Sequence, residues 1–550
     1  MKSQASLLSA LLLALLFTHA ASAGSATWNL NPLTGDWNTA ANWTPATVPN
    51  SSADTATFGV SNVIGISLSA NTEVNSIVFN PGASAFTITV SPNIVPTALT
   101  ITGAGIVNNS GITQNFATTV SATGQINFTN SATAGSSVVY TNSGGSSGSE
   151  PRTHFTNTSS AGSASFISEG GSDRNHIQAG AVDFIDSATA ANGTFSSNGG
   201  GKGALGGVVA FFATSTAANG NFTCEGGADT RAGGGLVQFG DTTSAGDAVF
   251  TCNGTDFVGS GGGAAVFIQS ATMGNATFIV NGGQVAGGAL QFNSLSAATG
   301  GTARVEVFGN GQLDISQHAA PGLTIGSLEG DGTVLLGSNN LGVGTNGLRT
   351  TFAGVISGSG SLVMSGSSRL TLLGANTYLG GTIMNLGGIV ANNNTGSATG
   401  PGPVLVNKDT LGGRGIIAGP VTIGDGLTGN AYLETSVVSS HATLTIQSSL
   451  TFKKDGAYVY KVNTSSVVAD QVVANGVTIG TGAQFRFNTT ANKQLPIGTA
   501  FTAINNTSAA PINGTFTNLA DGTILNAGRN NFQASYEGGD GNDLTLTVVP

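Results

Sequence analysis

Charged residues are scarce in this sequence, at 8% of 550 positions, and this scarcity excludes several classes of protein. In a typical globular enzyme roughly a quarter of the residues are Asp, Glu, Lys or Arg. The 16 basic residues are spread along a chain whose net charge is −10, so no basic patch is available to neutralise phosphates. We therefore expect neither nucleic acid nor anionic lipid as a partner.

Long apolar runs and cysteines are also scarce. The one apolar stretch, residues 7–17, follows Lys2 and precedes the small residues Ala21-Ser22-Ala23. This order is typical of a secretory signal peptide, residues 1–23, and the run is too short for a membrane-spanning helix of about 20 residues. Two cysteines, Cys224 and Cys252, are too few for a disulfide scaffold. We expect a secreted bacterial protein, extracellular or on the cell surface, without a transmembrane segment.

Glycine and aliphatic residues are abundant instead. The chain contains 84 Gly and 27 Phe and is 39% hydrophobic. The glycines lack the strict period of three of collagen, and the hydrophobic content is too high for a disordered chain. Glycine at turns with β-branched and aromatic residues between them indicates many short strands.

A repeat of about 27 residues runs through the middle of the chain. Each unit begins at a Phe and has a second large residue eleven positions later. Six units begin at Phe128, Phe155, Phe184, Phe211, Phe239 and Phe267, and their second large residues are Val139, Phe166, Phe195, Phe222, Phe250 and Phe278; a looser unit begins at Phe292. One such unit cannot bury its aromatic pair alone, so tandem units must stack.

The alternation of residues before each Phe predicts which face is buried. Val182 and Phe184 point one way and Asp183 the other, since residues two apart in a strand share a face. Gln238 and Gln291 repeat the polar position, which predicts one buried and one wet face. Glycine and asparagine at the corners allow positive φ. We predict an all-β, right-handed parallel β-helix with a cap at each end.

The two cysteines take equivalent positions in consecutive units. Cys224 follows Phe222 by two residues, and Cys252 follows Phe250 by two. One interpretation is a column of small core residues with two stacked free thiols. The other is a disulfide between coils, which in-register parallel strands would strain because both side chains point the same way.

A different pattern occupies the region after Thr351. Its core is Gly358-Ser359-Gly360-Ser361-Leu362, Leu370-Thr371-Leu372, Gly374-Ala375-Asn376-Thr377-Tyr378, Gly380-Gly381-Thr382 and Gly387-Gly388-Ile389-Val390. Over about 33 residues this core resembles the autotransporter-associated β-strand repeat family. The resemblance implies an exported, parallel β-helical passenger with interaction surfaces and no catalytic residue. The translocator barrel of such proteins is not recognisable here, so we expect a passenger-like protein without one.

These patterns divide the chain into five parts. They are a signal peptide (1–23), a Trp-rich N-terminal cap with the first coils (24–120), the tandem repeats (121–318), the region of family resemblance (319–439) and a C-terminal β region with a cap (440–550). Trp28, Trp37 and Trp43 all lie in the second part. They either form an aromatic cap or present a stacking surface for glycans.

Candidate chemistry is sparse. Gly538-Gly539-Asp540-Gly541-Asn542-Asp543 resembles a single calcium-binding nonapeptide of repeats-in-toxin proteins, but a turn explains it equally, and we predict no metal or other cofactor. A denser set of ionisable residues is Glu150, Arg152, His154, Glu169, Asp173, Arg174, His176, Asp183 and Asp186. Solvated loop charges are one interpretation, and a polysaccharide lyase or glycosidase site is the other.

The functional prediction is a non-enzymatic, adhesin-like protein whose polar surface binds extracellular polysaccharide, matrix or cell-surface components. The alternative is a secreted polysaccharide-active enzyme on the same fold.

Overall fold

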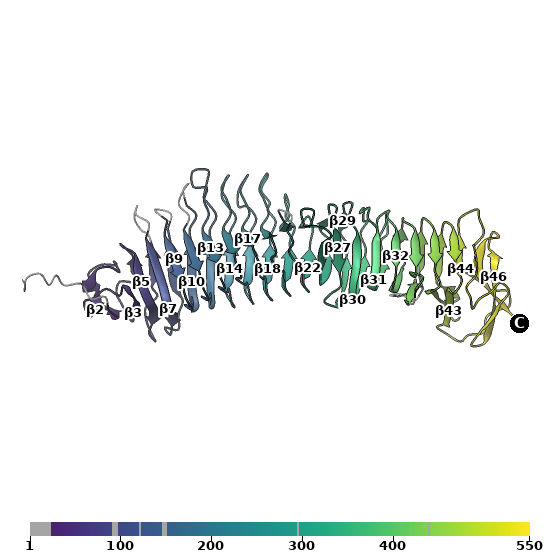
Figure 1. Cartoon of the computed structure of the whole chain (residues 1–550), viewed down its shortest axis with the longest axis horizontal. Helices are drawn as coiled ribbons and strands as arrows, with labels where there is room; N and C mark the ends of the chain where they lie inside the picture. The colour runs from purple at the N-terminus through teal and green to yellow at the C-terminus, as the bar shows by residue number, and fades with distance from the viewer. Residues whose placement is uncertain are drawn as a thin grey trace, which may run out of the picture.

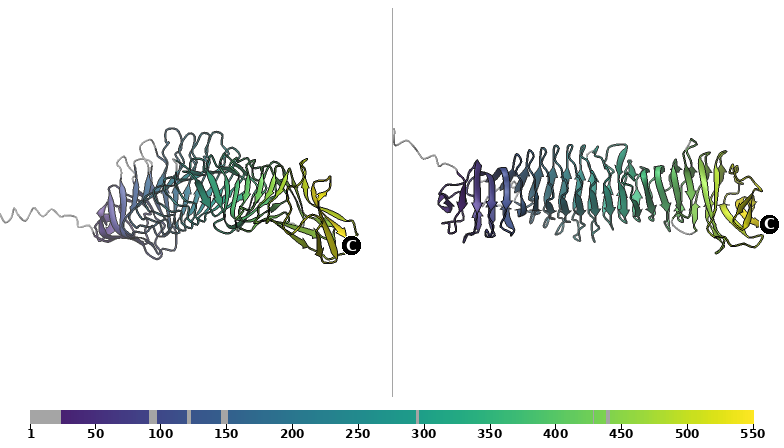
Figure 2. Two further views of the ribbon diagram at one scale, coloured as in Figure 1. Left: turned by 45° about the vertical axis from the view of Figure 1, so that its right-hand side comes forward. Right: turned by 90° about the horizontal axis from the view of Figure 1, so that it is seen from below.

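The computed structural model describes residues 24–90, 97–119, 123–145, 151–293, 296–427, 429–437 and 441–550. The expected signal peptide, residues 1–23, lies outside them. The described residues form an elongated stack of short strands that lie across its long axis (Figures 1 and 2). Within them the one helical element is the 3-10 turn η1 (Ala40–Asn42), and no helix is long and apolar enough to cross a bilayer. The expectation of an all-β chain is confirmed.

The first sheet runs along most of the stack. All its neighbours pair in parallel except the antiparallel pair β1 and β2. In spatial order its strands are β2 (Trp43–Thr44), β1 (Ala26–Trp28), β3 (Ser51–Phe58), β5 (Thr72–Phe79), β7 (Ala98–Asn108), β9 (Gln125–Phe128), β11 (Arg152–Phe155), β13 (Ala181–Phe184), β15 (Val208–Phe211), β17 (Leu236–Phe239), β19 (Ala264–Phe267), β21 (Ala289–Phe292), β23 (Gln312–Asp314), β26 (Thr333–Leu335) and β29 (Val355–Ser357).

A second set of strands alternates with the first along the chain. Its pairings are parallel except for β39 with β40. In chain order the set is β4 (Gly65–Ser67), β6 (Thr87–Val90), β8 (Gln114–Thr118), β10 (Ser136–Asn142), β12 (Ser163–Ser168), β14 (Thr194–Ser197), β16 (Asn221–Cys224), β18 (Val249–Cys252), β20 (Thr277–Val280), β22 (Arg304–Val307), β24 (Gly322–Ile325), β25 (Ser327–Gly330), β27 (Asn340–Val343), β28 (Arg349–Phe352), β30 (Leu362–Leu372), β31 (Thr382–Ala391), β32 (Val404–Val406), β33 (Asp409–Gly413), β35 (Val421–Ile423), β36 (Ala431–Glu434), β38 (Leu450–Phe452), β39 (Gly456–Asn463), β40 (Val468–Ala469), β42 (Val477–Ile479) and β43 (Gln484–Thr489). In the repeat region each coil therefore contributes one strand to each sheet, which is the topology of a parallel β-solenoid.

A third sheet lies at the C-terminal end. Its spatial order is β34 (Ile416–Ile417), β37 (Thr443–Ile446), β41 (Gln471–Ala474), β44 (Ala500–Asn506), β47 (Asp543–Val549), β46 (Asn530–Gly538) and β45 (Ile524–Ala527). The pairing changes from parallel to antiparallel after β44. The segment 538–543, which resembles a calcium nonapeptide, is the turn between β46 and β47, and the Asp543 carboxylate accepts the backbone N–H of Asn506 at 2.8 Å.

Aromatic columns fill the interior of the repeat region. Phe184 pairs in register with Phe211 in the first sheet, and Phe195 with Phe222 in the second. The ring centroids of these pairs lie 4.8 and 4.6 Å apart, and all four side chains are buried. The predicted register is thus correct from the second coil onward. The first coil differs, because a bulge in β10 places Tyr140 rather than Val139 in register with Phe166.

The prediction that the outer face of the first sheet is solvent-exposed along its whole length is wrong. Asp183 is only 4% exposed, and the equivalent positions in two other coils are the buried Ala210 and Val266. Gln238 and Gln291 remain half-buried. Flat parallel strands let neighbouring side chains cover one another, and Arg152 and His154 of the preceding coil supply Asp183 with its polar partners.

In the repeat region, the corner that follows a strand of the first sheet has the same backbone conformation in successive coils. The residue there has positive φ but is not glycine in six successive coils: Asn130, Asn157, Asp186, Ala213, Asp241 and Gln269. The Asn157 side chain accepts the backbone N–H of Asn130, and the Asp186 side chain accepts that of Asn157. Asp241 and Gln269 accept the corner N–H groups of Ala213 and Asp241 in the same way, so every corner side chain after Asn130 except that of Ala213 caps the previous coil, which offsets the cost of the left-handed conformation.

The cysteines occupy the interior of the second sheet. Cys224 and Cys252 are in register on β16 and β18, and both are free and fully buried. A hydrogen bond with Cys252, together with burial, raises the pKa of the Cys224 thiol. The interpretation as stacked free thiols is confirmed.

The three tryptophans lie at the N-terminal end of the stack. Trp28, Trp37 and Trp43 are 0–2% exposed and surround Phe58, with ring centroids 5.5–6.1 Å from it. The glycan-stacking interpretation of these residues is wrong, because the indole faces on which a sugar would stack are covered by one another and by Phe58.

The region that carries the family resemblance continues the stack. Asn376 is buried, accepts the backbone N–H of Ile356 at 2.7 Å and donates to the carbonyl of Ala398 at 2.6 Å. The Tyr378 hydroxyl lies 2.6 Å from the Thr382 hydroxyl in the core. The Asn-Thr-Tyr sequence therefore connects neighbouring coils, which explains its composition without any chemical role.

Candidate functional site

A row of projecting loops distinguishes the repeat region from the rest of the stack. After each strand of the second sheet, the chain leaves the stack and returns before the next strand of the first sheet. In Figure 1 these loops rise above the strands between β9 and β18 and become shorter toward β22. We call this row the fin, and its loops are residues 169–180, 198–207, 225–235, 253–263 and 281–288.

Glycine builds the fin because adjacent loops approach each other closely. A Cβ atom on Gly199 would lie 2.0 Å from the carbonyl oxygen of Gly226, and one on Gly234 would lie 2.0 Å from that of Gly262. Neither glycine has positive φ. Gly199 and Gly234 therefore serve the close approach of backbones, whereas Gly203 and Gly259 of the fin loops have positive φ, the role expected for glycine from the sequence.

Backbone hydrogen bonds order the fin. The N–H of Gly200 donates to the carbonyl of Gly233 at 2.9 Å, and that of Gly227 donates to Gly261 at 2.9 Å. At its base, the Asn253 side chain donates to Glu225 at 3.0 Å. The fin is thus a continuous hydrogen-bonded layer, so it holds the side chains at its tips in fixed relative positions.

The ionisable residues that the sequence placed together fall into separate groups. Asp173 and Arg174 lie at a fin tip, where they border an open hollow of about 430 Å³ with Asn175 and Lys202. The His176 ring is 3.2 Å from Asp173 in the same loop. The pKa of Asp173 is lowered, chiefly by the backbone N–H of Asn175.

The second group lies on the outer face of the first sheet. One Asp183 carboxylate oxygen is 2.7 Å from the Arg152 guanidinium and 3.2 Å from His154 Nδ1. Burial lowers the pKa of His154, partly opposed by the charge of Asp183. Asp183 thereby joins two adjacent coils.

The remaining members of the set serve the framework. Glu169 accepts the side-chain amide of Asn198 at 2.9 Å, and Asp186 caps the corner at Asn157. Glu150 lies outside the described residues.

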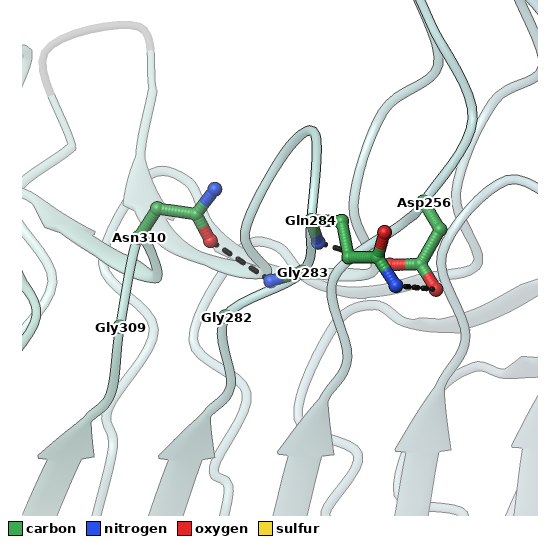
Figure 3. Close-up of a pocket in the computed structure, with 6 residues that line it drawn as sticks. All are labelled: Asp256, Gly282, Gly283, Gln284, Gly309 and Asn310. Atoms are coloured by element: carbon green, nitrogen blue, oxygen red, sulfur yellow. Dashed lines mark hydrogen bonds between the residues drawn. The ribbon is translucent and has the colours of Figure 1, made fainter.

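A notch lies where the fin becomes shorter. The loop 253–263 is followed by the shorter loop 281–288 and then by only residues 308–311 before β23. This decrease in loop length leaves a hollow of about 650 Å³, which is lined by Asp256, Gly282, Gly283, Gln284, Gly309 and Asn310 (Figure 3). We call this hollow the notch.

The side chains in the notch are held in place by hydrogen bonds. Asp256 accepts the backbone N–H of Gln284 at 2.9 Å and its side-chain amide at 3.4 Å. The Asn310 side-chain oxygen accepts the N–H of Gly283 at 2.8 Å, and its NH₂ group points away from this bond (Figure 3). Within the described residues, neither that NH₂ group nor the Gln284 side-chain oxygen has a hydrogen-bond partner in the chain.

The notch was not predicted from the sequence, although the sequence contains two signals for it. The loop after each repeat shortens from 253–263 onward. Phe257 and Phe308 also fall outside the eleven-residue spacing of the core phenylalanines.

One segment of this chain is similar to an autotransporter adhesin. A segment of 95 residues is 37% identical to the adhesin BmaC autotransporter of Brucella suis biovar 1 (strain 1330), and this match covers 17% of the chain and 3% of that relative. Among solved structures, the Haemophilus influenzae Hap adhesin matches with a TM-score of 0.28 and 12% identity, covering 90% of this chain and 63% of that one. No known family profile matches the chain.

Proposed function

We propose that this chain is a secreted or surface-displayed bacterial protein that binds partners outside the cell in the manner of an adhesin. The segment that is 37% identical to an autotransporter adhesin supports this proposal. The structural observation that carries it is the fin, an ordered row of loops that lifts polar and apolar side chains above a rigid stack. Loops held by a rigid scaffold are the usual place for binding residues.

The proposal includes the finer features that the sequence suggested. The coils wind right-handed, the Trp cluster and the C-terminal sheet act as caps, and residues 1–23 direct export. The caps matter because an uncovered strand at either end would recruit other chains. Extracellular polysaccharide, matrix or cell-surface components are the partners, and the chain needs no cofactor.

One observation favours the alternative, a polysaccharide-active enzyme. Arg152, His154 and Asp183 meet on an outer face, and a lyase needs a cation near the substrate carboxylate and a base near the abstracted proton. However, Arg152 and His154 are both already paired with Asp183, and Asp183 is buried beneath them. Release of unsaturated oligosaccharides from acidic polysaccharide, abolished by Arg152→Ala, would favour the enzyme over the adhesin.

Bead adhesion tests the main proposal. Beads coated with residues 24–550 are incubated with matrix-coated, glycan-coated and cell-covered surfaces, beside albumin-coated beads. Retention well above albumin on at least one surface is expected. Equal retention on every surface would refute the proposed function.

A further inference from the structure

We propose that the notch at the end of the fin binds a neutral saccharide unit. This inference rests on the proposed function, because it assigns a ligand class to a surface of an adhesin-like protein. It starts from the distribution of phenylalanine along the chain. Among the phenylalanines of the described residues, only Phe257 and Phe308 are exposed, at 43% and 37%, whereas Phe212 and Phe487 are half-buried and the rest are buried.

Both exposed phenylalanines flank the notch in the chain. Phe257 directly follows Asp256 in the longer loop, and Phe308 directly precedes Gly309 in the shorter one. Two apolar neighbours, Val258 and Val285, are also exposed, at 72% and 42%. Phe257 and Phe308 each adjoin in the chain a residue that lines the hollow, Asp256 and Gly309, so they bring exposed apolar area to the two loops that form it.

The polar groups of the notch suit a sugar. Sugar hydroxyls donate and accept hydrogen bonds at once, so they match a site with both kinds of group. Asn310 offers its NH₂ group, Gln284 its side-chain oxygen and Asp256 its carboxylate. Because these groups are already fixed by the chain, binding would require little further ordering.

Size and charge narrow the ligand class. The hollow of about 650 Å³ lies in the usual range for small-molecule sites, about 300–1,000 Å³. Asp256 is the only charged residue in its lining, and the Asp331 carboxylate accepts the N–H of Gly309 at 2.8 Å beside it. One carboxylate and no cation in the lining, with a second carboxylate bonded to Gly309, disfavour uronic and sialic acids and favour neutral hexoses and N-acetylhexosamines.

Saturation-transfer NMR on residues 24–550 tests the proposal with methyl glycosides of glucose, galactose, mannose and N-acetylglucosamine, and with glucuronic acid as the anionic counterpart. At least one neutral glycoside is expected to receive saturation, and glucuronic acid is not. Phe257→Ala, Phe308→Ala and Asn310→Ala should each weaken the neutral signal by about tenfold, as loss of a central contact does. The matched control Leu205→Ala removes a fin side chain that is 54% exposed and distant from the notch lining, and should leave the signal unchanged.

The outcomes separate the two proposals. If no neutral glycoside is saturated, if glucuronic acid is saturated equally, or if all three notch variants retain the signal, the notch proposal is wrong. Circular dichroism of each variant must match that of the parent chain, so that lost binding is not lost folding. Bead retention by the parent chain, with no neutral glycoside saturated, would overturn the notch proposal while leaving the adhesin-like function intact.

Discussion

The rings of Phe211 and Phe239 lie 4.7 Å apart, and their planes differ by only 4°. The two residues belong to consecutive coils and are paired in register, so the strand spacing sets the ring spacing. Each ring is also covered edge-on by a phenylalanine of the second sheet, as Phe211 is by Phe222 at 5.8 Å. The interior of the repeat region is therefore two continuous aromatic columns in edge-to-face contact rather than a set of separate cores.

Removal of a ring from one of these columns should destabilise several coils together. Phe211→Ala is expected to cost about 3–5 kcal/mol, because it leaves a cavity between two stacked neighbours. Phe211→Leu should cost less, since it refills most of the volume. Denaturant unfolding followed by circular dichroism measures both. Equal midpoints for the alanine variant and the parent chain would contradict the stacked column.

The corner residue Ala213 should be a weak point. Its φ of 57° is unfavourable for alanine, and it has no side chain to accept the backbone N–H of Asp186. Ala213→Asn is expected to stabilise the chain by about 1 kcal/mol, because asparagine tolerates this conformation and restores the cap seen at Asn157. Ala213→Gly relieves the conformation without supplying the acceptor. A glycine variant as stable as the asparagine variant would show that the cap contributes nothing.

Glycine in the fin should not tolerate a methyl group. Gly234→Ala would bring its Cβ to 2.0 Å from the Gly262 carbonyl oxygen, so the two loops must separate, at a cost of about 1–3 kcal/mol. Gly59→Ala is the control, because no heavy atom lies within 4 Å of the added Cβ. Thermal unfolding measures both variants. An equal loss of thermal stability in the two variants would mean that backbone entropy, and not the close approach of the loops, accounts for the effect of replacing the fin glycine.

The buried carboxyl group of Asp470 should give the chain a distinct pH dependence. Burial raises its pKa, against the hydrogen bonds from Ser436 and the N–H of Ala442. A raised pKa in the folded state means that the folded chain binds the proton of Asp470 more tightly than the unfolded chain does. The protonated carboxyl group of Asp470 therefore contributes to stability at low pH. This contribution is lost as the pH rises through the folded-state pKa, which lies above the ordinary value of about 3.9.

The Asp470→Asn variant tests the direction of this pH dependence. The stability of the parent chain relative to the variant should fall as the pH rises through that window, as measured by denaturant unfolding at several pH values. Asp540→Asn, at an exposed position, controls for the loss of one negative charge. A relative stability that rises with pH instead would show that the ionised form is the one the fold prefers.

Much of the fold was predictable because a stacked fold repeats its own pattern. The spacing of Phe184 and Phe211, and of Cys224 and Cys252, correctly predicted which residues share a register. Deviations from the period were harder to predict. The bulge that replaces Val139 with Tyr140 depends on how β10 pairs with β12, and nothing local in the sequence distinguishes the two residues as core candidates.

The surface was predicted less well than the core. Asp183 was expected in water, yet its partners Arg152 and His154 come from the preceding coil. Trp28 and Trp43 suggested a binding surface, but they pack on each other with ring centroids 5.0 Å apart. In both cases the side chain is covered by residues distant in sequence, whose positions follow from the stacking rather than from local pattern.

The sequence by itself determined the all-β class and the register of the aromatic residues in the repeat region, because residues that are buried at a regular interval recur at that interval in the chain. The tertiary structure alone decided what the exceptions to that period do. Asp256, Gln284 and Asn310 come from three successive loops and look unremarkable in the sequence, and they share a hollow only because each loop is stacked one coil above the last while its length decreases.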